Sequence, residues 1–211
     1  MSTMSVSRAA TTGLVGGALY LLFPLAWNLA NVTDVEYGTL SFVAVAASYW
    51  IFGVVAPALV VVGLAALRRD LGPDAGKVGA AGIVLSMIGL GAMSAGLGIE
   101  VASISLGGGE VALGHFTLLI GFLVHVVGSV LLGGRLFLRR RDAVTRAAAA
   151  LLVLALPLGI GLGMFGSAID PNDDTWFWAA ISVPTGLAWV LLGSSLRSIR
   201  RPVPAGYATA S

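Results

Sequence analysis

The sequence contains no cysteine, one lysine and little charge of either sign. Without cysteine, a disulfide, a thiolate nucleophile and a thiolate metal site are all excluded. Only 10% of the residues are charged, against about 25% in a typical soluble domain. A soluble protein of this length needs more charge to cover its surface. The one lysine, Lys77, lies in a polar connection, which excludes a retinal Schiff base inside an apolar segment.

Hydrophobic residues make up 57% of the 211-residue chain. They form recurring runs of about 20 residues, long enough to cross a bilayer as helices. We therefore predict an all-α integral membrane protein: a single membrane domain over 1–211, built as a bundle of six transmembrane helices. The expected spans cover residues 10–31, 46–67, 78–99, 112–134, 147–169 and 175–196, followed by a short tail over 197–211. With no soluble domain to carry a basic face, nucleic-acid binding is not expected.

The charges alternate in sign from one connection to the next. All 12 basic residues fall at the N-terminus, in the second and fourth connections or in the C-terminal tail. The first, third and fifth connections carry acidic residues and no Lys or Arg. Because positive loops are retained in the cytoplasm, we expect both termini to be cytoplasmic. The hydropathy layout is typical of small multi-pass proteins of prokaryotic plasma membranes, and we expect that location.

Two features of the chain leave alternatives open. Spans two, four and six each end in a glycine, a short stretch and arginines, as in "VLLGGRLFLRRR". This similarity predicts three outward-pointing helical hairpins, although the topology rule alone would also place arginines there. The segment after Arg8 resembles a signal peptide, but its apolar run exceeds the usual 7–15 residues. We therefore expect it to remain as the first span.

Small residues recur at helical spacing along four spans and predict the faces on which the helices pack, since small side chains let helix backbones approach in a membrane. The same faces are candidates for contact with a second copy or another protein. The predicted stripes are Gly13, Gly17, Tyr20, Pro24 and Asn28, with Asn31 one turn further; Gly82, Ser86, Gly89, Met93, Gly96 and Glu100; Gly114, Leu118, Gly121, His125, Gly128, Leu132 and Arg135; and Ala155, Gly159, Gly163, Gly166 and Asp170.

His125 lies in mid-span between Gly121 and Gly128 on one of these stripes, so we expect it to face other helices. One interpretation is a neutral imidazole that packs and hydrogen-bonds across a helix interface. The other is a ligand-binding or proton-accepting group in a polar cavity, a common role of ionisable groups inside membranes. We favour packing.

The outer ends of the stripes carry Asn28, Glu100 and Asp170, with His115 one residue after a glycine. These side chains are candidates to converge on a ligand or a transported ion. No metal-binding spacing such as H-x-x-x-H accompanies them, so no metal site is assigned. Haem is disfavoured because both histidines lie on one helix. No catalytic or cofactor-binding motif is present.

The sequence therefore favours a non-catalytic helical bundle that binds lipid or a small ligand, or that supports a partner. One alternative is a channel or transporter with an acidic outer vestibule and His125 in its path. Another is a membrane-embedded enzyme or a metal or haem protein. The arginine-rich face should attract anionic lipid headgroups at about 1 kcal/mol per well-placed cation. No particular cofactor is indicated.

Overall fold

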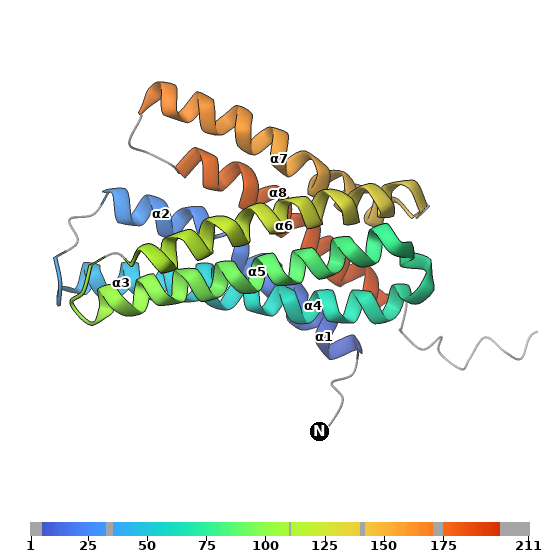
Figure 1. The fold of residues 1–211 in the computed structure, drawn as a ribbon, viewed down its shortest axis with the longest axis horizontal. Coiled ribbons are helices and arrows are strands. Elements are labelled where there is room, and N and C mark those ends of the chain that lie inside the picture. Colours follow the sequence, from blue (N-terminus) through green and yellow to red (C-terminus); the bar gives the residue numbers. More distant parts are fainter. Residues whose placement is uncertain (1–5, 33–35, 110, 140–141, 171–174, 199–211) are drawn as a thin grey trace, which may run out of the picture.

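The structure, a computed structural model, describes residues 6–32, 36–109, 111–139, 142–170 and 175–198. These residues are helical, as predicted, apart from short connections (Figure 1). The elements are α1 (Val6–Tyr20), α2 (Phe23–Val32), α3 (Leu40–Ser48), the π-helix η1 (Tyr49–Val55), α4 (Ala56–Leu71), the 3₁₀ turn η2 (Gly72–Ala75), α5 (Gly76–Ser105), α6 (Ala112–Arg139), α7 (Ala143–Ile169) and α8 (Thr175–Ser198).

Within the described residues, 5 helical segments are long and apolar enough to cross a membrane. The longest, Leu40–Ser105, contains η2, and Figure 1 shows α4 and α5 running back along one another from this turn. The turn begins at Gly72 and leads into Gly76, with φ of 47° and 61°. Both values lie in the left-handed region, which glycine enters without steric cost.

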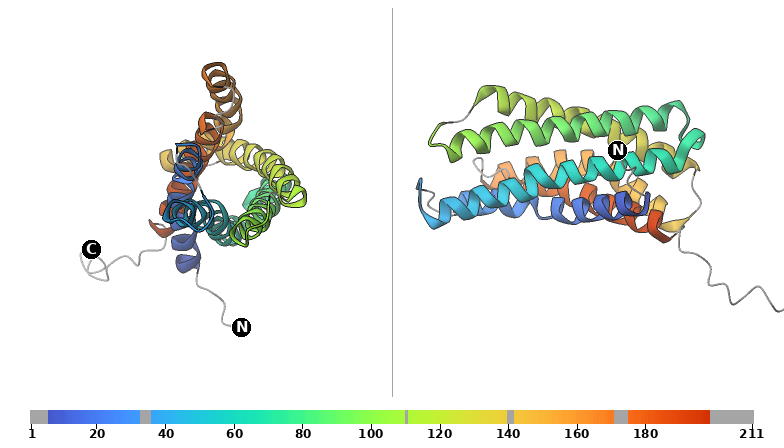
Figure 2. Two further views of the ribbon diagram at one scale, coloured as in Figure 1. Left: turned by 90° about the vertical axis from the view of Figure 1, so that its left-hand side faces the viewer. Right: turned by 90° about the horizontal axis from the view of Figure 1, so that it is seen from below.

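The helices pack in a closed circle that follows the order of the chain. The contacts run from α1 to α4, from α4 to α5, and then through α6 and α7 to α8. The contact of α8 with α1 closes the circle. The most extensive contacts join α5 to α6, α7 to α8 and α1 to α4. Viewed end-on, the C-terminal part of α7 projects from the bundle (Figure 2).

Two helical irregularities lie just before prolines. The first predicted span is broken between α1 and α2 at residues 21–22, close to Pro24, which has no N–H to offer the preceding turn. The π-helix η1 similarly lies next to Pro57, whose ring would clash with the carbonyl four residues earlier in a regular α-helix. Ser94 of α5 donates a hydrogen bond of 2.7 Å to the carbonyl of Val54 in this irregular segment.

Glycines bring the backbones of α5 and α6 into direct contact. A Cβ atom built on Gly82 would lie 2.6 Å from the backbone nitrogen of Leu132, and one on Gly96 would lie 2.6 Å from the carbonyl oxygen of Gly114. Between them, a Cβ on Gly89 would collide with the backbone nitrogen of His125. The two predicted stripes therefore face each other, as the small-residue spacing indicated.

The other tight helix pairs use the same principle with different partners. A Cβ on Gly13 of α1 would lie 2.6 Å from the Cα of Gly63 in α4, so these two backbones also touch. In α7, Gly159 packs instead against the side chain of Ile181, and Gly166 against that of Trp176, both in α8. The predicted stripes of α1 and α7 are thus buried, except for Asn28 and Asp170 at their ends, which are exposed.

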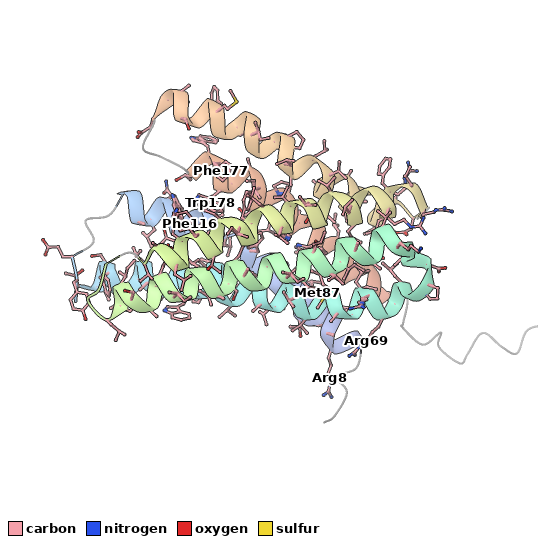
Figure 3. The ribbon with its side chains drawn as sticks, viewed as in Figure 1. Arg8, Arg69, Met87, Phe116, Phe177 and Trp178 are labelled. Carbon is pink, nitrogen blue, oxygen red and sulfur yellow. The ribbon has the colours of Figure 1, made fainter. Side chains whose placement is uncertain are left out.

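An aromatic cluster fills the interior toward the end of the bundle where α5 connects to α6. Trp178 is at its centre, with ring centroids 5.4 Å from Phe23, 5.3 Å from Trp27 and 5.8 Å from Phe122. Trp178 is only 4% exposed, so its indole is part of the core. In Figure 3, Phe177 and Trp178 lie toward the opposite end of the molecule from Arg69.

We expect Gly89→Ala to destabilise the fold and Gly91→Ala to leave it intact. A methyl group at position 89 must push α5 and α6 apart, and such overpacking costs about 1–3 kcal/mol. At Gly91 no neighbouring atom lies within 4 Å of the place that the new methyl group would take, and alanine is the better helix former by roughly 0.5–1 kcal/mol. Thermal unfolding of the two purified variants in detergent measures the difference. Equal melting temperatures would contradict the backbone contact.

Candidate functional site

The charged residues gather at the two ends of the bundle. The basic end is formed by the starts of α1, α5 and α7 and the ends of α4, α6 and α8 (Figure 1). Its described basic residues are Arg8, Arg68, Arg69, Lys77, Arg135, Arg139, Arg146 and Arg197. The acidic end is formed by the opposite helix termini and carries Glu36, Glu100 and Asp170.

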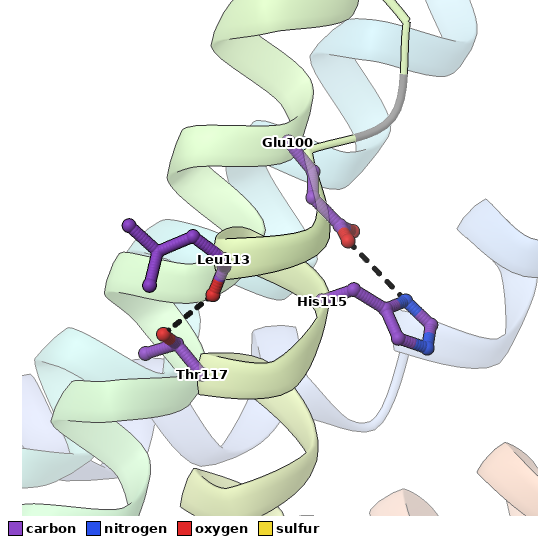
Figure 4. Close-up of polar contacts among 4 residues, drawn as sticks. All are labelled: Glu100, Leu113, His115 and Thr117. Carbon is purple, nitrogen blue, oxygen red and sulfur yellow. Dashed lines mark hydrogen bonds and ion pairs between the residues drawn. The ribbon is translucent and has the colours of Figure 1, made fainter.

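At the acidic end, Glu100 and His115 form a pair across the α5–α6 hairpin. The Nδ1 atom of His115 lies 3.3 Å from Oε1 of Glu100 (Figure 4), with 53% and 12% of the two side chains exposed. Gly114 makes room for the glutamate, since a Cβ there would lie 2.8 Å from its Cγ. An ion pair as exposed as this one stabilises a fold by at most about 1 kcal/mol.

The other two polar candidates at this end do not extend that pair into a cluster of metal ligands. Asn28 is exposed on α2, and Asp170 is the exposed C-cap residue of α7, whose backbone N–H donates to the carbonyl of Gly166. Among the described residues, no group of three His, Cys, Asp or Glu side chains is placed to hold a metal ion. Glu100 and His115 therefore offer two ligands, fewer than the three side chains that this kind of site would need.

His125 is enclosed at the contact between α5 and α6, with 1% of its surface exposed. Its imidazole lies near the backbone of Ser86, but neither ring nitrogen forms a hydrogen bond of ordinary geometry with a described residue. The hydroxyl groups of Ser86 and Ser129 are buried without such a bond as well. The prediction that His125 faces other helices is confirmed, and the backbone of Ser86 on α5 is the group nearest to a hydrogen-bond partner for its imidazole.

Four cavities in the described residues lie away from His125, since none of them is lined by this residue. The one enclosed by α1, α4 and α8 has a volume of ≈ 10 Å³, about the space of one water molecule. At the histidine itself the backbones of α5 and α6 are in contact, because a Cβ on Gly89 would collide with the backbone nitrogen of His125.

The two large cavities lie at the basic end and share Arg135. One, of ≈ 340 Å³, is lined by Asp74, Arg139 and apolar residues of α4, α5 and α6. The other, of ≈ 460 Å³, is a groove between the start of α5 and the end of α6 that also includes Lys77. Both volumes fall within the range of about 300–1,000 Å³ that is typical of ligand sites.

Arg135 separates these two cavities and ties α6 to η2. Its Nε donates a hydrogen bond of 2.9 Å to the carbonyl of Ala75, and its Nη2 donates one of 2.8 Å to the carbonyl of Asp74. The close approach depends on Gly76, where a Cβ would lie 3.0 Å from Nη2. The sequence placed Arg135 on the basic face and at the end of the fourth packing stripe, but it did not indicate the contact with η2. The signal it left unused was the pair of left-handed glycines that shape the turn.

No protein-family model, curated protein or solved structure matches this chain.

If His125 is a packing residue, its volume matters more than its nitrogens. His125→Met is of similar size and should cost less than about 1.5 kcal/mol. His125→Ala leaves a cavity and should cost about 2 kcal/mol or more. Unfolding of both variants in detergent, together with mass spectrometry of molecules that copurify, checks this. A stable His125→Met protein that has lost a molecule bound to the wild type would instead assign His125 to a binding site.

Proposed function

We propose that the chain crosses the membrane six times, with both termini in the cytoplasm. The proposal is supported by the reversal of direction at η2, which divides Leu40–Ser105 into two antiparallel parts. It is also supported by the gathering of basic side chains at one end of the bundle (Figure 3), because such residues remain on the cytoplasmic side. The strong pairing of α5 with α6 and of α7 with α8 favours three outward-pointing hairpins. We propose a prokaryotic plasma membrane as the location.

Within that arrangement, we propose that the protein is a non-catalytic bundle that binds membrane lipid at its cytoplasmic face. The observation that carries this proposal is the position of the large cavities. They lie at the basic end and share a guanidinium group, that of Arg135. The cytoplasmic leaflet carries anionic lipids, and basic pockets between helices on that side bind their headgroups.

The packing of α5 against α6 weighs against the transport alternative. A path from Glu100 to His125 would follow the interface between these helices. That interface is closed by the approach of Gly96 to Leu118, where a Cβ on the glycine would lie 2.5 Å from the backbone nitrogen. Opening it would require the two longest hairpin helices to separate. Lipid binding at the basic end requires no such movement.

Reporter fusions test the membrane topology. A fusion after Asp173 should report the outside of the cell, and a fusion at the C-terminus should report the cytoplasm, because the basic end is held inside. Alkaline phosphatase and a fluorescent protein serve as the two reporters, since each is active on one side only. If both fusions report the same side, the six-span arrangement is wrong.

Purification in a mild detergent tests ligand binding. We expect anionic phospholipid to remain bound and to be detected by mass spectrometry of the intact complex. Absorbance and elemental analysis of the same sample examine whether a chromophore or a metal is bound. Retention of a metal or chromophore in place of lipid would contradict the proposal and favour the enzyme or metalloprotein alternative.

A further inference from the structure

The groove between α5 and α6 at the basic end has a charged part and an apolar part. Lys77 and Arg135 supply the charge, whereas the remaining lining consists of glycine and aliphatic residues. The aliphatic members are Val78, Val130, Leu131 and Leu138. Val78 and Leu138 are more than half exposed, at 54% and 81%. The groove is thus open to the surroundings of the bundle along its apolar side.

Its two cations retain capacity for an anion. Lys77 is exposed and forms no ion pair with any described residue. Arg135 uses Nε and Nη2 for the carbonyls of Ala75 and Asp74, and of the five N–H groups of a guanidinium the pair on Nη1 makes no hydrogen bond to a described residue. Asp74 lines the neighbouring cavity and not this groove.

The start of α5 adds to the positive potential at the same point. This 30-residue helix begins at Gly76, one of the groove's lining residues. Its N-cap residue, Ala75, makes no side-chain cap hydrogen bond. Because the amides of a helix N-terminus attract anions, the helix end, Lys77 and Arg135 all favour negative charge at one place.

Gly134 supplies the floor of the apolar part. A Cβ built there would meet no neighbouring atom within 4 Å, so a larger side chain would extend into the open space of the groove without displacing the helices. A charged end that continues into an exposed apolar hollow matches an amphiphile, with an anionic group joined to a hydrocarbon chain. A soluble anion would bind the two cations but would make no contact with the apolar walls of the groove.

We propose that this groove binds one anionic phospholipid. Its phosphate lies between the ammonium group of Lys77 and Nη1 of Arg135, and the start of an acyl chain lies over Gly134 against Val130 and Leu138. The site deepens the proposed function and rests on it, since it names the lipid class and the residues that hold it. Arg135 then has two roles, because the same guanidinium anchors η2 and faces the phosphate.

The test measures binding of phosphatidylglycerol and phosphatidylcholine to the purified full-length protein by native mass spectrometry, and the thermal stabilisation that each lipid gives. Lys77→Gln removes one cation without touching a described hydrogen bond and should weaken phosphatidylglycerol binding about five-fold, the effect of one cation at an anionic headgroup. Gly134→Leu fills the hollow and should abolish binding at this site. In phosphatidylcholine, Lys77→Gln should leave the melting temperature unchanged, and Gly134→Leu should raise it slightly because glycine is the weaker helix former.

Matched controls are Arg69→Gln, an exposed arginine at the same end, and Gly91→Leu, an exposed glycine with open space around it on α5. Both should bind phosphatidylglycerol as the wild type does. If Lys77→Gln and Gly134→Leu also bind like the wild type, or if the controls lose binding equally, the assignment of the groove is wrong while lipid binding stands. If the wild type binds no phosphatidylglycerol, the proposed function fails as well. If inorganic phosphate gives the same stabilisation and Gly134→Leu retains it, the site binds a soluble anion and the lipid proposal is overturned.

Discussion

The contact between the backbones of α5 and α6 is the constraint on which the rest of the fold depends. Inside a membrane, apolar side chains gain little by leaving lipid for protein, so helices associate through close packing instead. Gly82, Gly89 and Gly96 provide it on α5, and each approaches the backbone of α6. Two helices joined along most of their length form a rigid wall. The pairs α7–α8 and α1–α4 complete the circle around it.

This mode of packing also decides where polar chemistry can occur. Helices in backbone contact leave no room for water between them, and the cavity among α1, α4 and α8 is correspondingly small. Among the ionisable groups, His125 is the main one that lies away from the ends of the bundle, and it is buried. Glu100 and His115 pair at the end where α5 connects to α6, and Lys77 and Arg135 line one groove at the opposite end. Binding sites are therefore expected at the ends of the helices.

The sequence predicted the faces of the helices better than their partners. Small residues at helical spacing identified the buried stripes because α-helical geometry alone fixes which positions share a face. Spacing within one helix does not say which neighbour it meets, so the contact of Gly13 with Gly63 was not foreseen. Nor were the π-helix before Pro57 and the anchoring of η2 by Arg135, which depend on tertiary contacts. Asn28 continued its stripe in the sequence, but the break between α1 and α2 leaves it exposed.

Adjacent glycines on α6 illustrate why spacing alone could not identify the proposed lipid site. Gly133 is buried, and a Cβ there would lie 2.7 Å from the carbonyl oxygen of Ala149 on α7. Gly134 faces away from that contact into open space. A glycine inside a helix weakens it by roughly 0.5–1 kcal/mol relative to alanine. At Gly134 no close helix contact compensates for this loss of stability. Gly91 is similarly open, but only Gly134 lines a groove with two cations. The binding site is therefore inferred from Lys77 and Arg135, which line the same groove, and not from the glycine itself.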